Sequence, residues 1–375
     1  MSILRAKTID LKQTNSLTEL QQKNSNLNES ESYNQTIILE AKPRRLVFEL
    51  TNACNLNCIM CGRNSAEFKA TTFDFKWTEK FENILNEVEE VTLMGWGEPT
   101  VHPNFVDFLY WAKKNGLRKY FCTNGMKLDK LFDDIFNTEA DIIAISLDGA
   151  SREINDKIRS GADFNHIIKN IRHIADEKIK RGVNWPYMNF VFTAMKSNLY
   201  EIPKMVRLAK DVGLQELKVV YLTVFDENMH DESLYDCQDE VKKVFEEAEV
   251  LADELNIILK LPHIQGEDSA CGKLHKDCFT AWRDFFLGSD GFVRSCMSTP
   301  IKLFHIDKYK TFEEMWNSLE YKKFRRNINT VNMNDSCKVC YQSSFANWNK
   351  KSSFIQIGNK FSPEWDKEES HLVTL

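Results

Sequence analysis

The sequence predicts an α/β fold: a partial, TIM-like (β/α)6 barrel followed by a small cysteine-rich C-terminal domain. Two observations carry this prediction. Between residues 45 and 222, short apolar segments alternate with segments of helical apolar spacing, a pattern typical of parallel strands joined by right-handed helical crossovers. Five of the ten cysteines fall after residue 270, where the alternation has ended.

The barrel elements can be placed in order along the chain. Strands are expected at residues 45–51, 91–94, 120–123, 141–147, 189–195 and 217–222. Helices are expected at 77–89, 105–114, 128–136, across most of 154–180, and at 201–212. The first of these has apolar side chains at helical spacing, namely Phe81, Ile84, Leu85 and Val88. Gly116 follows the second, as is common after a helix C-terminus.

Five segments are expected along the chain. They are a flexible leader at 1–42, the barrel core at 43–225, an acidic helical connector at 226–265, the cysteine-rich domain at 266–345 and a tail at 346–375. The leader is rich in Asn, Gln, Ser, Glu and Lys without a periodic apolar face, which predicts a mobile segment. An arm that folds over the substrate opening is the alternative.

Composition excludes several classes of function. The net charge of −6 and the pI near 5.9 argue against a nucleic-acid-binding surface. No apolar run reaches membrane-spanning length, and the N-terminus lacks the apolar core of a signal peptide. A cytoplasmic protein without a membrane partner is expected. Ten cysteines in such a chain indicate metal or redox chemistry and not a disulfide framework.

Cys54, Cys58 and Cys61 follow the first strand at a C-x3-C-x2-C spacing. Three thiolates on one short loop can converge on a soft metal centre. A [4Fe-4S] cluster normally takes four cysteines, so three imply one iron open to another ligand. A zinc site is the alternative, because zinc ligands often come as C-x2-C pairs.

This spacing resembles the signature of the radical S-adenosylmethionine (radical SAM) enzymes. The resemblance implies that Cys54, Cys58 and Cys61 are the catalytic residues, binding a [4Fe-4S] cluster whose open iron is chelated by SAM. The reduced cluster would cleave SAM to a 5'-deoxyadenosyl radical, which abstracts hydrogen from the substrate. The segment 95–99 resembles the Gly-Gly-Glu-Pro motif that holds the SAM amine in this family, and it runs Gly95, Trp96, Gly97, Glu98 and Pro99.

Polar residues also follow the later strands. These residues are Asn124, Ser146 and Asn198. Barrel folds place active sites at the carboxyl ends of their strands, so these side chains are expected to point into one opening of the barrel, its mouth, together with Cys61 and Glu98. The resemblance implies that Asn124 and Asn198 lie around SAM and that Ser146 binds its carboxylate or ribose. Arg159 is a further candidate for a carboxylate contact, with a solvated helix charge as the alternative.

The C-terminal cysteines predict a second metal site. Asp290-Gly291 between two apolar segments predicts a hairpin that brings Cys278 and Cys296 together. Cys337 and Cys340 form a C-x2-C pair that completes four thiolates. Cys271 is a fifth candidate that could replace one of them. Zinc remains an alternative at this site, because four-cysteine sites suit either metal.

The pattern Cys278-x12-Gly291-x4-Cys296 resembles the start of the SPASM extension, which carries auxiliary iron–sulfur clusters. A full SPASM domain has further cysteines after the position of Cys340, and none follow here. The resemblance is therefore to the "twitch" variant with one auxiliary [4Fe-4S] cluster, which implies electron transfer from a substrate radical. Met297 follows Cys296, where sulfatase-maturing relatives have an aspartate.

These observations lead to one expected function and two alternatives. The expected function is a radical SAM oxidoreductase or maturase that modifies a ribosomal peptide or protein. The first alternative is oxidation of an aminosugar, aminocyclitol or other small metabolite by the same mechanism. The second is a zinc-stabilised, non-catalytic scaffold. The resemblance also implies a flavodoxin- or ferredoxin-type electron donor.

Overall fold

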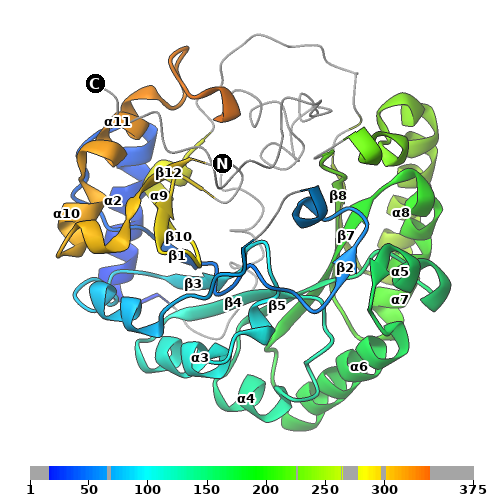
Figure 1. The fold of residues 1–375 in the computed structure, drawn as a ribbon. Coiled ribbons are helices and arrows are strands. Elements are labelled where there is room, and N and C mark those ends of the chain that lie inside the picture. Colours follow the sequence, from blue (N-terminus) through cyan, green and yellow to red (C-terminus); the bar gives the residue numbers. More distant parts are fainter. Residues whose placement is uncertain are drawn as a thin grey trace.

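A single curved sheet runs through most of the molecule in the computed structural model (Figure 1). The structure describes residues 17–65, 69–224, 227–262, 264, 278–296 and 301–337. The main sheet has ten strands in the order β12-β11-β10-β1-β3-β4-β5-β7-β8-β9. Figure 1 shows the helices α3, α4, α6, α7 and α8 along the outer, convex side of this sheet.

The six strands expected from the sequence are all present and all parallel, which confirms the partial (β/α)6 barrel. They are β1 (Arg45–Phe48), β3 (Glu90–Leu93), β4 (Arg118–Thr123), β5 (Ile142–Ser146), β7 (Tyr187–Ala194) and β8 (Glu216–Tyr221). A further parallel strand, β9 (Ile258–Lys260), pairs with β8 at one edge. The carboxyl ends of these strands therefore meet at one side of the barrel.

The helices agree with the prediction in place and differ in extent. The barrel helices are α3 (Phe105–Lys114), α4 (Phe132–Asn137), α5 (Arg152–Ile158), α6 (Phe164–Arg181), α7 (Ile202–Asp211) and α8 (Gln238–Leu255). The helix expected at 77–89 is instead a 3-10 helix, Phe75–Phe81, followed by turns. Its apolar side chains are buried as expected, so the apolar spacing identified the packing face and not the backbone hydrogen bonds.

The helix expected across 154–180 is interrupted. Between α5 and α6 the chain forms a short strand, β6 (Arg159–Ser160), which pairs antiparallel with β2 (Asn57–Cys58) of the cysteine loop. Gly161, at a φ of +92°, lets the chain turn after β6, and Asp163 caps the start of α6. The interruption brings Arg159 opposite Cys58.

The prediction of a structureless leader is wrong for part of it. Residues 19–33 form a helix, α2 (Glu19–Tyr33), that begins with a capping box between Thr18 and Gln21. Its buried residues are all polar, namely Gln21, Asn24, Ser25, Asn28 and Glu31. A helix without an apolar stripe can still pack when its buried polar groups all find hydrogen-bond partners. The apolar-face criterion therefore missed this helix.

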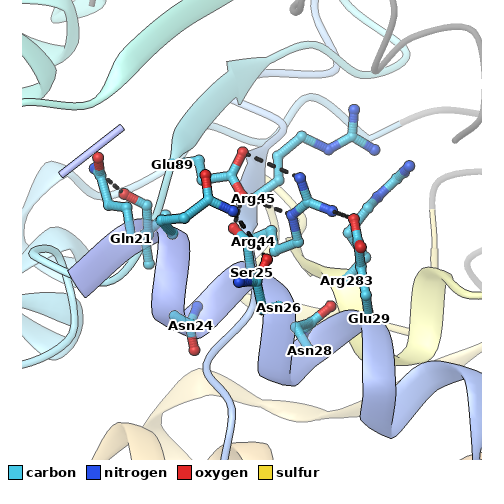
Figure 2. Close-up of polar contacts among 12 residues, drawn as sticks. Gln21, Asn24, Ser25, Asn26, Asn28, Glu29, Arg44, Arg45, Glu89 and Arg283 are labelled. Carbon is cyan, nitrogen blue, oxygen red and sulfur yellow. Dashed lines mark hydrogen bonds and ion pairs between the residues drawn. The ribbon is translucent and has the colours of Figure 1, made fainter. Parts of the chain in front are cut away.

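The partners of α2 lie at the amino ends of the barrel strands (Figure 2). Gln21 donates to the carbonyl of Val88 at 2.7 Å, and Asn24 donates to the carbonyl of Glu87 at 3.1 Å. Ser25 hydrogen-bonds to Glu89, and Figure 2 shows Arg44 between Glu29 and that glutamate. The helix thus binds the end of the barrel opposite the carboxyl ends of the strands.

The C-terminal unit continues the barrel sheet. Strand β10 (Asp284–Leu287) pairs parallel with β1, and the expected hairpin is confirmed because β10 pairs antiparallel with β11 (Phe292–Arg294). Strand β12 (Lys302–His305) extends it. The helices of this unit are α9 (Thr280–Arg283), α10 (Phe312–Trp316) and α11 (Leu319–Asn327). Pairing of β10 with β1 fixes this unit against the barrel.

Candidate functional site

The cysteine loop leaves the carboxyl end of β1 and gathers three thiols. Cys58 is buried, and Cys54 and Cys61 are half-buried. Burial raises the pKa of the Cys58 thiol to about 11, the positive charge of Arg159 opposes this shift, and the nearby Cys61 and Cys54 add to it. The three sulfur atoms are therefore close enough to interact. A metal centre would have to supply the stabilisation that keeps them as thiolates.

The groups beside these sulfur atoms are hydrogen-bond donors. The backbone N–H of Leu56 donates to Cys54 Sγ at 3.4 Å, and the amide of Asn124 lies 3.9 Å from the same sulfur. The guanidinium of Arg159 lies 3.9 Å from Cys58 Sγ. Such donors stabilise thiolates without competing as ligands.

The two candidate metal centres would use these thiols differently. In a tetrahedral zinc site all the ligands bind one ion. In a [4Fe-4S] cluster each cysteine binds a separate iron, so the three thiols of this loop could hold three of the four irons.

The glycines of the 95–99 loop allow a close approach between backbones. A Cβ atom on Gly97 would lie 2.3 Å from the carbonyl oxygens of Thr51 and Ala53, at the entrance of the cysteine loop. A Cβ atom on Gly95 would collide with the side chain of Glu49. Trp96 is half-buried, so a large side chain is accommodated at this position. The loop therefore lies directly against the cysteine loop.

Glu98 does not point into the mouth as expected. Its buried carboxylate accepts hydrogen bonds from the backbone N–H and hydroxyl of Thr100, from the hydroxyl of Thr123 and from the backbone N–H of Asn124. Burial raises the pKa of Glu98, and these hydrogen bonds lower it. Glu98 thus ties the loop after β3 to the loop after β4.

The two asparagines differ in their positions. Asn124 lies at the cysteine loop, where its amide donates to the Asn55 side chain at 2.8 Å. Asn198 is buried in the loop after β7, and its side chain bonds to backbone groups. Its amide donates to the carbonyls of Asp148 and Thr193, and its oxygen accepts the backbone N–H of Met195. Its polar atoms thus join the end of β7 and the loop after it to the segment that follows β5, so Asn198 is a structural link between the two.

Ser146 ends β5 and is half-buried, with its hydroxyl 3.5 Å from the sulfur of Cys122. Arg159 is buried, so the alternative of a solvated helix charge is wrong. Its Nε lies 2.7 Å from Oδ2 of Asp148, which is fully buried and also accepts the backbone N–H of Thr193. Burial raises the pKa of Asp148, and Arg159 opposes the shift. The buried pair aims Arg159 at the cysteine loop.

Sequence reasoning missed Asp148 and the position of Cys122. Asp148 stands two residues after Ser146, in the polar segment that follows β5, and that placement was the available signal. Cys122 lies within β4, and a free cysteine in a strand is commonly an ordinary buried residue. The structure places it beside Ser146 and within electrostatic reach of Arg159.

The second group of cysteines is described in part. Burial raises the pKa of Cys278 to about 11, and the neighbouring Cys296 adds to the shift, so the hairpin does bring these two together. Cys337 is buried in the same unit. Cys271 and Cys340 lie outside the described residues. A buried set of thiols suits a metal centre, because thiolates are the ligands of both iron–sulfur clusters and structural zinc.

Two family models match the chain. The radical SAM superfamily matches residues 48–191, and the SPASM iron–sulfur cluster-binding domain matches residues 278–341. The first range contains the barrel from β1 to β7 with the cysteine loop. The second contains Cys278, Cys296, Cys337 and Cys340.

Three relatives indicate how widely such chains differ in substrate. A tungsten-containing aldehyde ferredoxin oxidoreductase cofactor-modifying protein of Pyrococcus furiosus is 25% identical, over 59% of this chain and 63% of its own length. An AdoMet-dependent heme synthase of Methanosarcina barkeri is 24% identical, over 81% of this chain and 90% of its own length. The antilisterial bacteriocin subtilosin biosynthesis protein AlbA of Bacillus subtilis is 24% identical, over 74% of this chain and 60% of its own length. The chain thus spans less than two thirds of the first and third of these relatives.

Solved structures share the fold. SuiB of Streptococcus suis, bound to the precursor peptide SuiA, has a TM-score of 0.63 at 16% identity, covering 93% of this chain and 83% of its own. Native anSMEcpe, with bound AdoMet and Cp18Cys peptide, has a TM-score of 0.57 at 18% identity; the match covers 87% of this chain and 95% of that chain. The same arrangement of barrel and C-terminal unit therefore occurs in proteins of low sequence identity.

The matched families confirm the expected cofactors, which are SAM, a [4Fe-4S] cluster and an auxiliary iron–sulfur cluster. The barrel, the three-cysteine loop and the glycine loop beside it agree with the first family, and the hairpin cysteines agree with the second. No helix in the described part of the chain has the length and apolar character needed to span a membrane. The chain belongs to the radical SAM superfamily and carries a SPASM-type iron–sulfur cluster-binding domain.

Proposed function

We propose that this chain is a radical SAM oxidoreductase that modifies a ribosomal peptide or protein. The observation that carries the proposal is the convergence of Cys54, Cys58 and Cys61 beside the glycine loop, with hydrogen-bond donors at the sulfur atoms. SAM bound to the reduced cluster supplies a 5'-deoxyadenosyl radical that abstracts hydrogen from the substrate. The chain has to hold both groups and shield them from water.

Each part of the site has a role in this proposal. The three cysteines bind the catalytic cluster, and the segment 95–98, Asn124 and Ser146 bind SAM. Arg159, held by Asp148, faces Cys58 and offers a positive charge to the anionic cluster or to the SAM carboxylate. Glu98 and Asn198 are positioning residues, because their side chains hydrogen-bond only to other parts of the protein.

The auxiliary cluster is proposed to bind Cys278, Cys296, Cys337 and Cys340. With these four ligands the cluster would have no iron open to a substrate, and the chemistry that it would supply is one-electron transfer. The net reaction would be an oxidation, and a flavodoxin- or ferredoxin-type protein would supply the first electron. The proximity of Cys278 and Cys296 supports this ligand set.

The peptide substrate is proposed from the relatives. SuiB binds a precursor peptide, and AlbA acts in the biosynthesis of a bacteriocin. Oxidation of a small metabolite is the second candidate. One observation favours it: the heme synthase aligns over 81% of this chain and 90% of its own length, which is more of both chains than AlbA covers.

The test uses anaerobically purified protein. About eight irons per chain are expected for two [4Fe-4S] clusters, whereas stoichiometric zinc would indicate the scaffold alternative. Replacing Cys54, Cys58 and Cys61 with alanine should abolish 5'-deoxyadenosine formation. Continued formation of that product would overturn the site. Incubation with peptides encoded beside the gene, and with metabolites of neighbouring pathways, then separates the two substrate classes.

A further inference from the structure

The cysteine loop has an exposed side directly beside one of its buried thiols. Strand β2 contains Asn57, which is exposed, and Cys58, which is buried. The next residue, Ile59, is exposed again, with 44% of its surface open to solvent. Cys58 therefore points into the protein from a segment whose neighbouring side chains point out of it.

The end of α5 and strand β6 lie beside this exposed segment. Asn57 pairs with Ser160 in the β2–β6 ladder, and the backbone N–H of Ile59 donates to the carbonyl of Ile158 at 2.9 Å. Lys157 directly precedes Ile158 in the last turn of α5, and both Lys157 and Ser160 are exposed. Figure 1 shows β2 next to α5. Asn57, Ile59, Lys157 and Ser160 together form one exposed surface, which we name the loop face.

The two segments that form the loop face differ in charge from the rest of the chain. Residues 50–66 contain no Asp or Glu and one cation, Arg63. Residues 152–163 contribute three cations and three carboxylates. One of these carboxylates, Asp156, is half-buried and lies 3.5 Å from Arg152. A small excess of positive charge thus lies here on a chain whose net charge is −6, which suits an acidic partner.

The other described neighbours of the cysteine loop are parts of the barrel. The amide of Asn124 lies 3.9 Å from Cys54 Sγ, and Gly97 lies against the backbone at the entrance of the loop. An electron has to reach the catalytic cluster from outside before SAM can be cleaved. Because electron transfer slows steeply with distance, its donor has to approach where the cluster ligands are nearest to solvent. A single exposed apolar residue is common on protein surfaces, so it is the position of Ile59 next to Cys58 that gives it meaning.

We propose that the loop face is the docking surface for a small, acidic one-electron carrier protein. Ile59 is the apolar contact at the centre of this surface, and Lys157 is the cation at its rim that attracts the carrier. In the transfer the carrier is oxidised by one electron and the catalytic cluster is reduced by one electron, and no bond forms or breaks. This inference rests on the proposed function, because it requires a cluster bound by Cys54, Cys58 and Cys61.

The first test measures binding without turnover. Oxidised flavodoxin and, separately, oxidised ferredoxin are titrated calorimetrically into the anaerobically purified full chain, and the carrier that binds identifies the type of donor. Lys157→Glu should raise the Kd about tenfold at low ionic strength. The difference should disappear in about 1 M salt, where the Debye length is about 3 Å. Lys210→Glu is the matched control, because Lys210 is also exposed in the last turn of a barrel helix, α7, and it should leave the Kd unchanged.

The second test compares two sources of electrons. When the carrier supplies electrons, Ile59→Glu should lower the rate of 5'-deoxyadenosine formation about tenfold. When excess dithionite supplies them, no docking surface is needed, and the rate should stay within about twofold of the wild type. Ile179→Glu makes the same substitution on α6, at an isoleucine that is 80% exposed, and should change neither rate. If Ile59→Glu loses iron, Lys157→Glu, which lies outside the cysteine loop, is assayed in its place.

Equal Kd values for Lys157→Glu and Lys210→Glu would overturn the proposal. A wild type that is active with dithionite and binds neither carrier would overturn it as well. If Ile59→Glu retained its iron and lost activity with both sources of electrons, the side chain would support the cluster and not docking, which contradicts the proposal. A wild type that forms no 5'-deoxyadenosine with dithionite would instead refute the catalytic cluster, so failure of the proposed function is seen separately.

Discussion

The hydroxyl of Ser289 donates a hydrogen bond of 3.1 Å to the carboxylate of Glu49. Ser289 lies in the turn between β10 and β11, and Glu49 directly follows β1 at the start of the cysteine loop. The other carboxylate oxygen of Glu49 accepts the backbone N–H of Trp96 at 2.8 Å. One buried side chain therefore joins the hairpin, the cysteine loop and the glycine loop.

Replacing Glu49 with glutamine should loosen this junction. A glutamine amide has one oxygen and one NH2 group, so either Trp96 or Ser289 loses its acceptor and faces another donor. The free energy of unfolding should fall by about 1–3 kcal/mol, and SAM affinity should fall with it. Urea denaturation and isothermal titration with SAM are the measurements. Ser289→Ala removes the hydroxyl contact only and should have the smaller effect; the reverse order would contradict this account.

Arg159 and Asp148 should behave as a coupled pair. Removing one member of a buried ion pair leaves the other charge uncompensated and costs about 3–5 kcal/mol. Arg159→Met alone should therefore destabilise more than Arg159→Met combined with Asp148→Asn. Urea denaturation of the single and double variants measures the coupling. Strict additivity of the two substitutions would show that the 2.7 Å contact contributes nothing.

The same pair predicts a pH dependence. Burial raises the pKa of Asp148 in the folded protein, and Arg159 lowers it, so the pKa rises further when Arg159 is replaced. A folded state that binds more protons than the unfolded state becomes less stable as the pH rises. The loss in free energy of unfolding caused by Arg159→Met should therefore be larger at pH 8 than at pH 5. A deficit independent of pH would indicate that Asp148 does not carry the effect.

Asp290 should show the reverse pH dependence, because its carboxylate stabilises the hairpin at neutral pH and loses this effect in acid. Arg294 contacts its carboxylate at 2.7 and 2.8 Å, Lys302 lies at 3.1 Å, and the pKa of Asp290 is lowered from 3.8 to about 2. A lowered pKa gives stabilisation that is present above about pH 4 and lost as the pH falls toward 2, and it amounts to about 2 kcal/mol.

Asp290→Asn should therefore be less stable than the wild type at pH 7 and nearly equal to it at pH 2. Urea denaturation across this range is the measurement. Asp307→Asn, in the same unit, is the control, because that carboxylate is 63% exposed and its ion pairs are loose. An equal loss of unfolding free energy in both variants would mean that the contacts of Asp290 do not stabilise the hairpin.

Much of the barrel could be predicted from the sequence because its strands are buried apolar segments and its helices have an apolar face. The cysteine loop could be predicted because three cysteines at a fixed spacing have few other uses. The directions of Glu98 and Asn198 could not. Both side chains bond to backbone groups of neighbouring loops, and only the folded chain brings those groups together.

Two other features depend on contacts that are distant in sequence. A solvated helix charge was the alternative for Arg159, and its burial follows from the pairing of β6 with β2, which lies about one hundred residues earlier. Pairing of β10 with β1 connects residues that are 239 apart. The pairing of β6 with β2 has no periodic signal in the sequence, since both strands are two residues long.

The polar face of α2 gives the last prediction. Asn28 is buried and donates to the carbonyls of Lys42 and Trp282, at 3.1 and 2.7 Å, so it joins the helix to the C-terminal unit. Asn28→Ala leaves both carbonyls without these donors and should lower the free energy of unfolding by about 1–3 kcal/mol. Urea denaturation of the full chain, read by tryptophan fluorescence, is the measurement.

Asn26 provides the matched control two positions away on the same helix. It is exposed and accepts an exposed hydrogen bond from Gln22, so Asn26→Ala should change the free energy of unfolding by less than about 0.5 kcal/mol. Both substitutions replace asparagine with alanine within one helix, so helix propensity contributes equally to each. The difference between the two variants therefore measures the buried contacts alone. Equal stabilities would mean that α2 is not fixed to the barrel in solution, and the leader would then be mobile as its composition suggests.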